Sequence, residues 1–261
     1  MKYYLGIDVG SVSTKLAVLN SRMEIIVDVC LPTRGEPAAA VKSGLTGITE
    51  QLPAGTTIKR IGITGSAREM IAKLVSADTV KNEITTQATA ALHYFPDART
   101  VIEIGGQDSK IILIEDGLVR DFGMNSICAA GTGSFLDHQA ERLGLSRERF
   151  GELACASCSP NRVSGRCTVF AESEMIHKQQ SGAKTEDIVY GLCQSLVQNY
   201  LNSVAAGKEI LPPVVFQGGL AYNRGMLRAF EEELHTELLI PDRPELTGAA
   251  GAAILASRRL L

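Results

Sequence analysis

The chain has 261 residues, of which 45% are hydrophobic and 21% charged, and its formal net charge is -3. This is an ordinary globular composition with room for two modest domains, and it gives no reason to expect nucleic acid or a membrane as a partner. No apolar run approaches a membrane span, and Asp8 comes too early for a secretory signal, so we expect a cytoplasmic protein. Its six cysteines are then thiols or metal ligands rather than disulfides.

The first predicted element is a β-hairpin that turns at Gly10, because apolar runs stand on both sides of this glycine. Glycine lets a backbone approach a ligand closely and point its N–H groups at it. Ser11 and Ser13 add hydroxyl groups to the turn, and Lys15 can neutralise a phosphate. Asp8, just before the turn, can hold Mg²⁺ through water.

The same pattern recurs later in the chain, where Glu103, Gly105 and Lys110 repeat the spacing of the acid, glycine and lysine. The second turn also contains Gly106, Gln107, Asp108 and Ser109. Either hairpin alone is explained equally well as an ordinary glycine turn. The matched pair instead favours two hairpins that grip the phosphates of one nucleotide, in a chain without a Gly-x-x-x-x-Gly-Lys-Ser/Thr loop.

Two cysteines, Cys128 and Cys167, each open a helix-like segment. A thiolate at a helix start faces unpaired N–H groups and the positive end of the helix dipole, which suits it to bind metal. Two such thiolates are half of the set that an iron–sulfur cluster takes, and the alternative is a pair of packing residues without metal. Gly131 and Gly133, in the first segment, are further candidates for cofactor binding.

The other four cysteines have simpler interpretations. Cys155 and Cys158 form a C-x-x-C pair, which is a redox-active or incidental pair unless a fourth metal ligand joins them and Cys167. Cys30 and Cys193 are predicted to be buried as small hydrophobic residues.

The remaining pattern predicts an α/β protein with two hairpin-based halves around a nucleotide cleft. Helices are expected near 36–52, 66–75, 81–94, 133–143, 169–181 and 185–206, the last capped by Thr185. A strand ends at Gly218 and Gly219, and Asn223 precedes a further helix, an arrangement that commonly approaches a nucleotide. Gly248 lies in a run of small residues that would let a helix pack against a ligand or another helix.

In this order, the motifs resemble those of the ATP-dependent activators of 2-hydroxyacyl-CoA dehydratases, which belong with the BadF/BadG/BcrA/BcrD-type ATPases. The segments that carry the resemblance are Asp8–Ser11, Ile104–Lys110, Cys128–Gly133, Cys167–Glu174 and Gly218-Gly219. The resemblance implies an actin-like two-domain fold. We place the first domain at 1–96 and the second at 97–261, with the C-terminal helix able to pack back onto the first.

The resemblance also implies a homodimer with one bridging [4Fe–4S] cluster, to which each subunit contributes Cys128 and Cys167. ATP or ADP with Mg²⁺ would lie between the domains, and the cluster would pass one low-potential electron to an acceptor iron–sulfur enzyme. That acceptor is a 2-hydroxyacyl-CoA dehydratase or a double-cubane cluster reductase, and the donor is a reduced ferredoxin or flavodoxin.

The roles of single residues follow from the resemblance as well. Asp8 would hold the Mg²⁺ shell, and Asn223 with the paired glycines before it would line the adenosine side. Gln107 or Asp108 would orient the attacking water or report on the γ-phosphate. Glu103 departs from the aspartate that is usual in this superfamily. Two alternatives are a small-molecule kinase of the same superfamily and a non-enzymatic iron–sulfur redox sensor.

Overall fold

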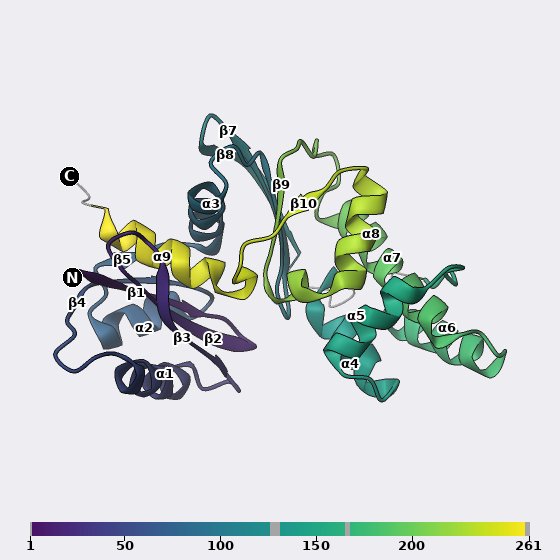
Figure 1. The fold of residues 1–261 in the computed structure, drawn as a ribbon, viewed down its shortest axis with the longest axis horizontal. Coiled ribbons are helices and arrows are strands. Elements are labelled where there is room, and N and C mark those ends of the chain that lie inside the picture. Colours follow the sequence, from purple (N-terminus) through teal and green to yellow (C-terminus); the bar gives the residue numbers. More distant parts are fainter. Residues whose placement is uncertain (1, 126–130, 165–167, 259–261) are drawn as a thin grey trace. The chain divides into compact units, whose positions relative to one another are not determined.

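The computed structural model describes residues 2–125, 131–164 and 168–258 (Figure 1). Cys128 and Cys167 lie outside these ranges. The chain divides into two compact units. Unit 1 comprises the chain as far as Asp97 together with the chain from Leu246 onward, and unit 2 comprises Ala98–Glu245. The C-terminal helix thus belongs to unit 1, although it is far from the rest of that unit in sequence.

Unit 1 is built on a five-stranded sheet in the order β3-β2-β1-β4-β5. Its strands are β1 (Tyr3–Val9), β2 (Ser13–Leu19), β3 (Ile25–Pro32), β4 (Ile58–Thr64) and β5 (Thr79–Val80). The predicted first hairpin is confirmed, because β1 and β2 pair antiparallel with Asp8 opposite Lys15. Its helices are α1 (Pro37–Gln51), α2 (Arg68–Val75), α3 (Glu83–Tyr94) and α9 (Thr247–Ser257).

The two faces of β1 pack against different helices because successive side chains of a strand point to opposite faces. Leu5, Ile7 and Val9 join a core cluster with residues of α1 and α2. Tyr4, on the other face, joins a cluster with the alanines of α9 and with Ile254. The sheet of unit 1 is therefore covered by helices on both faces.

Small residues let α9 lie directly on the sheet. A Cβ atom added to Gly6 would overlap the carbonyl oxygen of Ala249, and one added to Gly62 would overlap that of Ala252. In the same way, a Cβ atom on Gly251 would overlap a carbonyl oxygen of α3. The run of small residues near the C-terminus is thus explained in large part by close packing of one helix on two strands and a neighbouring helix.

Unit 2 repeats this topology. Its sheet has the order β10-β9-β6-β7-β8, which, read from β8, is the order of unit 1. The strands are β6 (Thr100–Ile104), β7 (Ser109–Glu115), β8 (Leu118–Asn125), β9 (Val214–Gln217) and β10 (Leu238–Leu239). Glu103 pairs with Lys110 across the second hairpin. The repeat that the two glycine turns predict therefore extends to all five strands of each sheet.

The helices of unit 2 surround a long central helix. They are α4 (Gly133–Arg142), α5 (Arg147–Ala156), α6 (Thr168–Gln180), α7 (Thr185–Ser203) and α8 (Arg224–Leu234). Leu192, Leu196 and Tyr200 of α7 share a core cluster with the sheet and with Phe230 of α8. None of the described helices is long and apolar enough to cross a membrane.

Three local predictions need correction. Helix α5, which is short and rather polar, was not predicted. Its N-cap is Ser146, whose hydroxyl oxygen accepts a hydrogen bond from the Arg149 N–H at 3.2 Å. The N-cap of α7 is Lys184, so Thr185 is the first helical residue. Cys30 is exposed rather than buried, because β3 is an edge strand with one face toward the core. Val27 and Val29 pack against the core, and Cys30, the residue after Val29, points to the other face.

The prediction for Cys193 is confirmed. This residue lies on α7 and is fully buried in the core of unit 2. Burial raises the pKa of its thiol, since the thiolate would lose its hydration there. Cys193 is therefore a packing residue.

The close packing of α9 can be tested by Gly62→Ala. We expect this variant to lose about 1–3 kcal/mol of unfolding free energy, because its methyl group meets backbone that cannot move aside. Gly47→Ala on α1 is the matched control, since its Cβ would lie 3.3 Å from a movable Val29 methyl group. Urea unfolding measures both, and equal stabilities of the two variants would contradict the packing argument.

Candidate functional site

The first glycine turn is held in place by backbone and threonine contacts. The Gly10 N–H donates to the carbonyl of Ser13 at 3.0 Å, which closes the turn. Thr33, at the end of β3, donates its hydroxyl to the Gly10 carbonyl at 2.7 Å and its N–H to the Val12 carbonyl at 2.8 Å. Ser11 is exposed at the tip. The sequence analysis missed Thr33, a buried polar residue whose only signal was its place after a strand.

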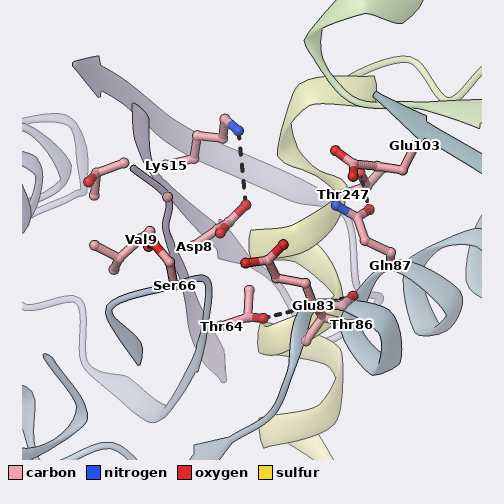
Figure 2. A network of polar contacts seen from close by, with 12 residues as sticks. Asp8, Val9, Lys15, Thr64, Ser66, Glu83, Thr86, Gln87, Glu103 and Thr247 are labelled. Carbon is pink, nitrogen blue, oxygen red and sulfur yellow. Dashed lines mark hydrogen bonds and ion pairs between the residues drawn. The ribbon is translucent and has the colours of Figure 1, made fainter. Parts of the chain in front are cut away.

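Asp8 lies beside the start of α9. Its Oδ2 atom is 3.9 Å from the Lys15 ammonium and 2.5 Å from where a Cβ atom on Gly248 would stand (Figure 2). The positive end of the α9 dipole therefore faces the carboxylate. Thr247 donates its hydroxyl to the side-chain oxygen of Gln87 on α3 at 2.7 Å. Unit 1 thus brings Asp8, Lys15 and Gly248 together, and it adds two residues that the sequence analysis missed.

A second turn of unit 1 packs against the first. Gly65, which follows β4, has φ +96°, and a Cβ atom there would be 2.5 Å from the backbone nitrogen of Val9. Ser66 donates its hydroxyl to the Val9 carbonyl at 3.2 Å (Figure 2). Only glycine accepts this conformation in so little space. A glycine directly after a buried strand was the sequence signal for this contact.

The second glycine turn has the same backbone contact as the first, since the Gly105 N–H donates to the Asp108 carbonyl at 3.0 Å. Its lysine differs from Lys15. The Lys110 ammonium lies 2.8 Å from Glu103 and 2.9 Å from Asp108, and its side chain is only 2% exposed. A buried ammonium requires such partners. Lys110 therefore stabilises the turn, and its predicted contact with phosphate stays a prediction.

Helix α4 begins directly on this turn. The N–H groups of Gly133 and Ser134 donate to the carbonyls of Gly105 and Gly106, both at 2.9 Å. These bonds satisfy N–H groups that a helix start leaves without a partner inside the helix. Two hydrogen bonds thus join the turn to the start of the helix that follows the Cys128 segment.

The third glycine turn approaches the same acid. Gly218 has φ +86°, and a Cβ atom there would be 3.0 Å from Oε1 of Glu103. Apart from its chain neighbours, no described residue has an atom within 4 Å of where a Cβ atom on Gly219 would lie, so this side of the turn is open in the described structure. The side-chain oxygen of Asn223 accepts from the Met226 N–H at 3.1 Å and caps α8. Contacts of these residues with adenosine stay predictions.

The chain shortly before Cys167 and the chain shortly after Cys128 both lie against one stripe of α7. We call Asp187, Gly191, Ser195 and Asn199, spaced four residues apart, the α7 seam. The Asp187 carbonyl accepts from the Asn161 N–H at 2.9 Å, and a Cβ atom on Gly191 would overlap the Asn161 carbonyl oxygen.

The next two residues of the seam contact the flanks themselves. The Ser195 hydroxyl donates to the carbonyl of Val163, close before the Cys167 segment. A Cβ atom on Gly131, directly after the Cys128 segment, would be 3.0 Å from the Asn199 side-chain oxygen. Ser195 and Asn199 are one helical turn apart, which is about 5–6 Å.

Cys155 and Cys158 are both exposed at the end of α5. The Arg228 guanidinium donates to the carbonyls of Cys155 and Ser157 at 3.3 and 3.1 Å and so covers this helix end. No group of three histidine, cysteine or acidic residues that could hold a metal ion occurs in the described ranges. A local metal site at the C-x-x-C pair therefore gains no support from these residues.

Comparisons with known proteins agree with this geometry. A model of the BadF/BadG/BcrA/BcrD ATPase family matches residues 5–256. The 2-hydroxyisocaproyl-CoA dehydratase activator of Clostridioides difficile is 36% identical, over 97% of this chain and 94% of the relative. The structure of component A of (R)-2-hydroxyglutaryl-CoA dehydratase from Acidaminococcus fermentans has a TM-score of 0.87 at 34% identity, covering 98% of each chain. That of the Clostridium difficile activator with bound ADPNP has a TM-score of 0.85 at 34% identity, covering 97% of this chain and 94% of the other.

Two sheets of equal topology, each with a glycine-turned hairpin, define an α/β protein of the actin-like ATPase class. The fold expected from the sequence is thus confirmed. Because the family model spans nearly the whole chain, the protein belongs to the BadF/BadG/BcrA/BcrD ATPase family. The predicted family is confirmed as well.

The buried ion pair of the second hairpin predicts a large effect of Lys110→Met. We expect a loss of about 3–5 kcal/mol of unfolding free energy, because the variant leaves Glu103 buried without its ammonium. Adding Glu103→Gln should recover more than half of this loss. Lys15→Met, at the matching position of the first hairpin, should cost less than about 1 kcal/mol, since that pair is longer and more exposed. Urea titrations test this, and similar losses for both lysines would refute it.

The carboxylate of Asp187 holds the chain on both sides of Cys158 by hydrogen bonds, and we call this contact the anchor of the C-x-x-C loop. We predict that the anchor depends on pH. Hydrogen bonds from the Ser157 hydroxyl at 2.7 Å and the Ser159 N–H at 3.1 Å lower the pKa of its carboxyl group. A lowered folded-state pKa means that the anchor is complete above the unfolded pKa of about 3.9 and is lost as the pH falls through the folded value.

We therefore expect the exchange protection of the Ser159 amide to be constant from about pH 5 to 8 and to fall below about pH 4. Asp187→Ala should remove the protection at every pH. The control is Asp78→Ala, which removes a comparable anchor in unit 1, where Asp78 accepts from the Ile61 N–H at 2.8 Å. Protection of Ser159 that survives Asp187→Ala would disprove the anchor.

Proposed function

We propose that this protein is an ATP-dependent activator that couples ATP binding and hydrolysis to the transfer of one low-potential electron into an acceptor iron–sulfur enzyme. The observation that carries the proposal is the matched pair of turns at Gly10 and Gly105. Both close with the same N–H to carbonyl hydrogen bond at 3.0 Å, and both stand between an acid and a lysine on equivalent strands. Such turns present backbone N–H groups to phosphate.

In this proposal Asp8 holds Mg²⁺ through water, and Ser11 and Lys15 contact phosphate in unit 1. The exposed tip at Ser11 and the partly exposed Lys15 side chain support these roles. In unit 2, the residues from Gly106 to Asp108 contact phosphate, and the paired glycines line the adenosine side. The open space beside Gly219 and the ADPNP bound to a relative support the nucleotide assignment.

We also propose that Cys128 and Cys167 of two subunits hold one [4Fe–4S] cluster in a homodimer. Support comes from the described flanks, because Val163 accepts a hydrogen bond from the α7 seam and Gly131 lies close to the seam one helical turn further along. The described ends of both cysteine segments thus lie near neighbouring positions of one helix. When bound, the cluster would supply a site that stores and passes one electron. A two-fold axis would complete the ligand set by repeating both cysteines.

The contacts of α4 provide the coupling. The N–H groups of Gly133 and Ser134 donate hydrogen bonds to carbonyls of the second glycine turn. In this proposal, a nucleotide that moves this turn also moves α4 and the chain before it. A nucleotide changes such an equilibrium only as far as it binds one state more tightly than the other. We propose that ATP favours the state that delivers the electron.

The partners follow from the family. Two relatives are a 2-hydroxyisocaproyl-CoA dehydratase activator and an (R)-2-hydroxyglutaryl-CoA dehydratase activating ATPase. We propose a 2-hydroxyacyl-CoA dehydratase as the acceptor, or a double-cubane cluster reductase, and a reduced ferredoxin or flavodoxin as the donor. In this proposal the protein works with soluble partners in the cytoplasm.

Anaerobic purification tests the cluster. We expect about four iron atoms per two chains and a dimeric mass. Cys128→Ser and Cys167→Ser should each lose most of the iron. Cys30→Ser is the control, because this exposed cysteine lies in unit 1 and should leave the iron content unchanged. An iron-free monomer, or full iron in Cys128→Ser, would refute the bridging cluster.

A turnover assay separates the alternatives. An activator should release phosphate from ATP without any phosphoryl acceptor. Stoichiometric phosphorylation of a sugar or acid by an iron-free chain would instead show a kinase, and ATP binding without hydrolysis in either redox state would show a sensor.

A further inference from the structure

Gln217, the last residue of β9, is fully buried, and neither atom of its side-chain amide has a hydrogen-bond partner among the residues that the structure describes. Buried polar groups are nearly always hydrogen-bonded, because an unpaired one has lost its water and gained nothing in return. Such a group in a native fold points to a bound water, an ion or a role in chemistry. The sequence analysis gave this residue no role.

The strand register places this amide beside Glu103. Residues directly opposite on neighbouring strands point to the same face of a sheet. Gln217 is opposite Glu103 in the parallel β6–β9 pair, and Glu103 is opposite Lys110 in the β6–β7 hairpin. The amide therefore shares a face with the buried ion pair, at the end of the sheet where the glycine turns begin.

The carboxylate of Glu103 also faces both of these turns. Its Oε2 atom is 2.8 Å from the Lys110 ammonium. Its Oε1 atom lies 3.0 Å from where a Cβ atom on Gly218 would stand and 3.5 Å from that position on Gly105. Lys110 thus fixes the direction in which the carboxylate points. Because neither glycine has a Cβ atom, the backbone of both turns can lie close to Oε1.

A water molecule is the ligand that matches this pair. An amide offers two donor hydrogens and an acceptor oxygen, and a carboxylate accepts, so one water can bond both at once. Buried waters in proteins typically have two to four such partners. We propose that Gln217 and Glu103 together bind the water that attacks the γ-phosphate of ATP, which makes Gln217 a catalytic residue. This inference rests on the proposed ATP hydrolysis.

The reaction needs no further reactant. The water oxygen forms a bond to the γ-phosphorus, and the bond from that phosphorus to the bridging oxygen breaks, so the electron pair leaves with ADP. One water proton passes to the Glu103 carboxylate and from there to solvent. The Gln217 carbonyl accepts the other hydrogen and so directs the water's lone pair at the phosphorus.

Gln107 and Asp108, which the resemblance to the family suggests for orienting this water, are less buried than Gln217. Gln107 is exposed, and the Asp108 carboxylate is bonded to Lys110. An enclosed amide holds a water in one orientation, whereas an exposed one exchanges it with solvent.

Gln217→Met tests the assignment, because methionine has nearly the same length and no amide. We expect kcat for ATP hydrolysis to fall at least about 100-fold. Nucleotide affinity should stay within about threefold, and the melting temperature should not decrease, since an unpaired buried amide is removed. The control is Gln139→Met on α4, where a second buried amide has no partner in the described part of the chain. This variant should also keep its melting temperature, but its kcat should stay within about twofold.

Gln217→Glu provides a second measurement that does not depend on the methionine variant. A carboxyl group beside Glu103 has a raised pKa, and its protonated form can hold water as the amide does. We therefore expect its kcat to rise at least about tenfold between pH 8 and pH 5.5 relative to the parent chain. A flat ratio, or a Gln217→Met chain that hydrolyses ATP within threefold of the parent, would overturn the assignment alone. A parent chain that binds ATP without hydrolysing it would overturn the proposed function and this assignment together.

Discussion

The ammonium of Lys110 lies buried between the carboxylates of Glu103 and Asp108, at 2.8 and 2.9 Å. A charge without water is tolerated there only because both acids neutralise it and accept its hydrogen bonds. The pair joins the two strands at the base of the glycine turn, so Gly105 keeps the geometry on which α4 begins. It also holds the Glu103 carboxylate beside Gln217. The candidate chemistry and the proposed coupling in unit 2 both depend on this ion pair.

The two units use one topology for different electrostatic purposes. In unit 1, Lys15 is partly exposed and 3.9 Å from Asp8, and the start of α9 faces that carboxylate. A long and partly exposed ion pair contributes little to stability. In unit 2 the corresponding lysine is committed to two acids. Equal spacing in the sequence therefore produces a partly exposed lysine in one hairpin and a buried lysine in the other.

Prediction from the sequence succeeded where the signal was local. The hairpins follow from apolar runs around glycine, and the burial of Cys193 follows from its place on an apolar helix. It failed where the cause was a neighbour in space. Cys30 is exposed because β3 is an edge strand, and Thr33 matters because its hydroxyl reaches the Gly10 carbonyl. The sequence around Cys30 does not show that its strand lies at the edge of the sheet, and the sequence around Thr33 does not show that Gly10 lies beside it.

By itself, the sequence determined the α/β class and the repeated acid–glycine–lysine spacing, because periodicity and turn chemistry are properties of adjacent residues. The family and its actin-like fold followed from the resemblance of short motifs, which are likewise runs of adjacent residues. Only the tertiary structure decided that the C-terminal helix belongs to unit 1, since that depends on glycines such as Gly6 leaving room for it. It also decided that Lys110 is buried and that Gln217 has an unpaired amide. Burial and pairing depend on which strands and helices meet, and this is set by the packing of the whole unit.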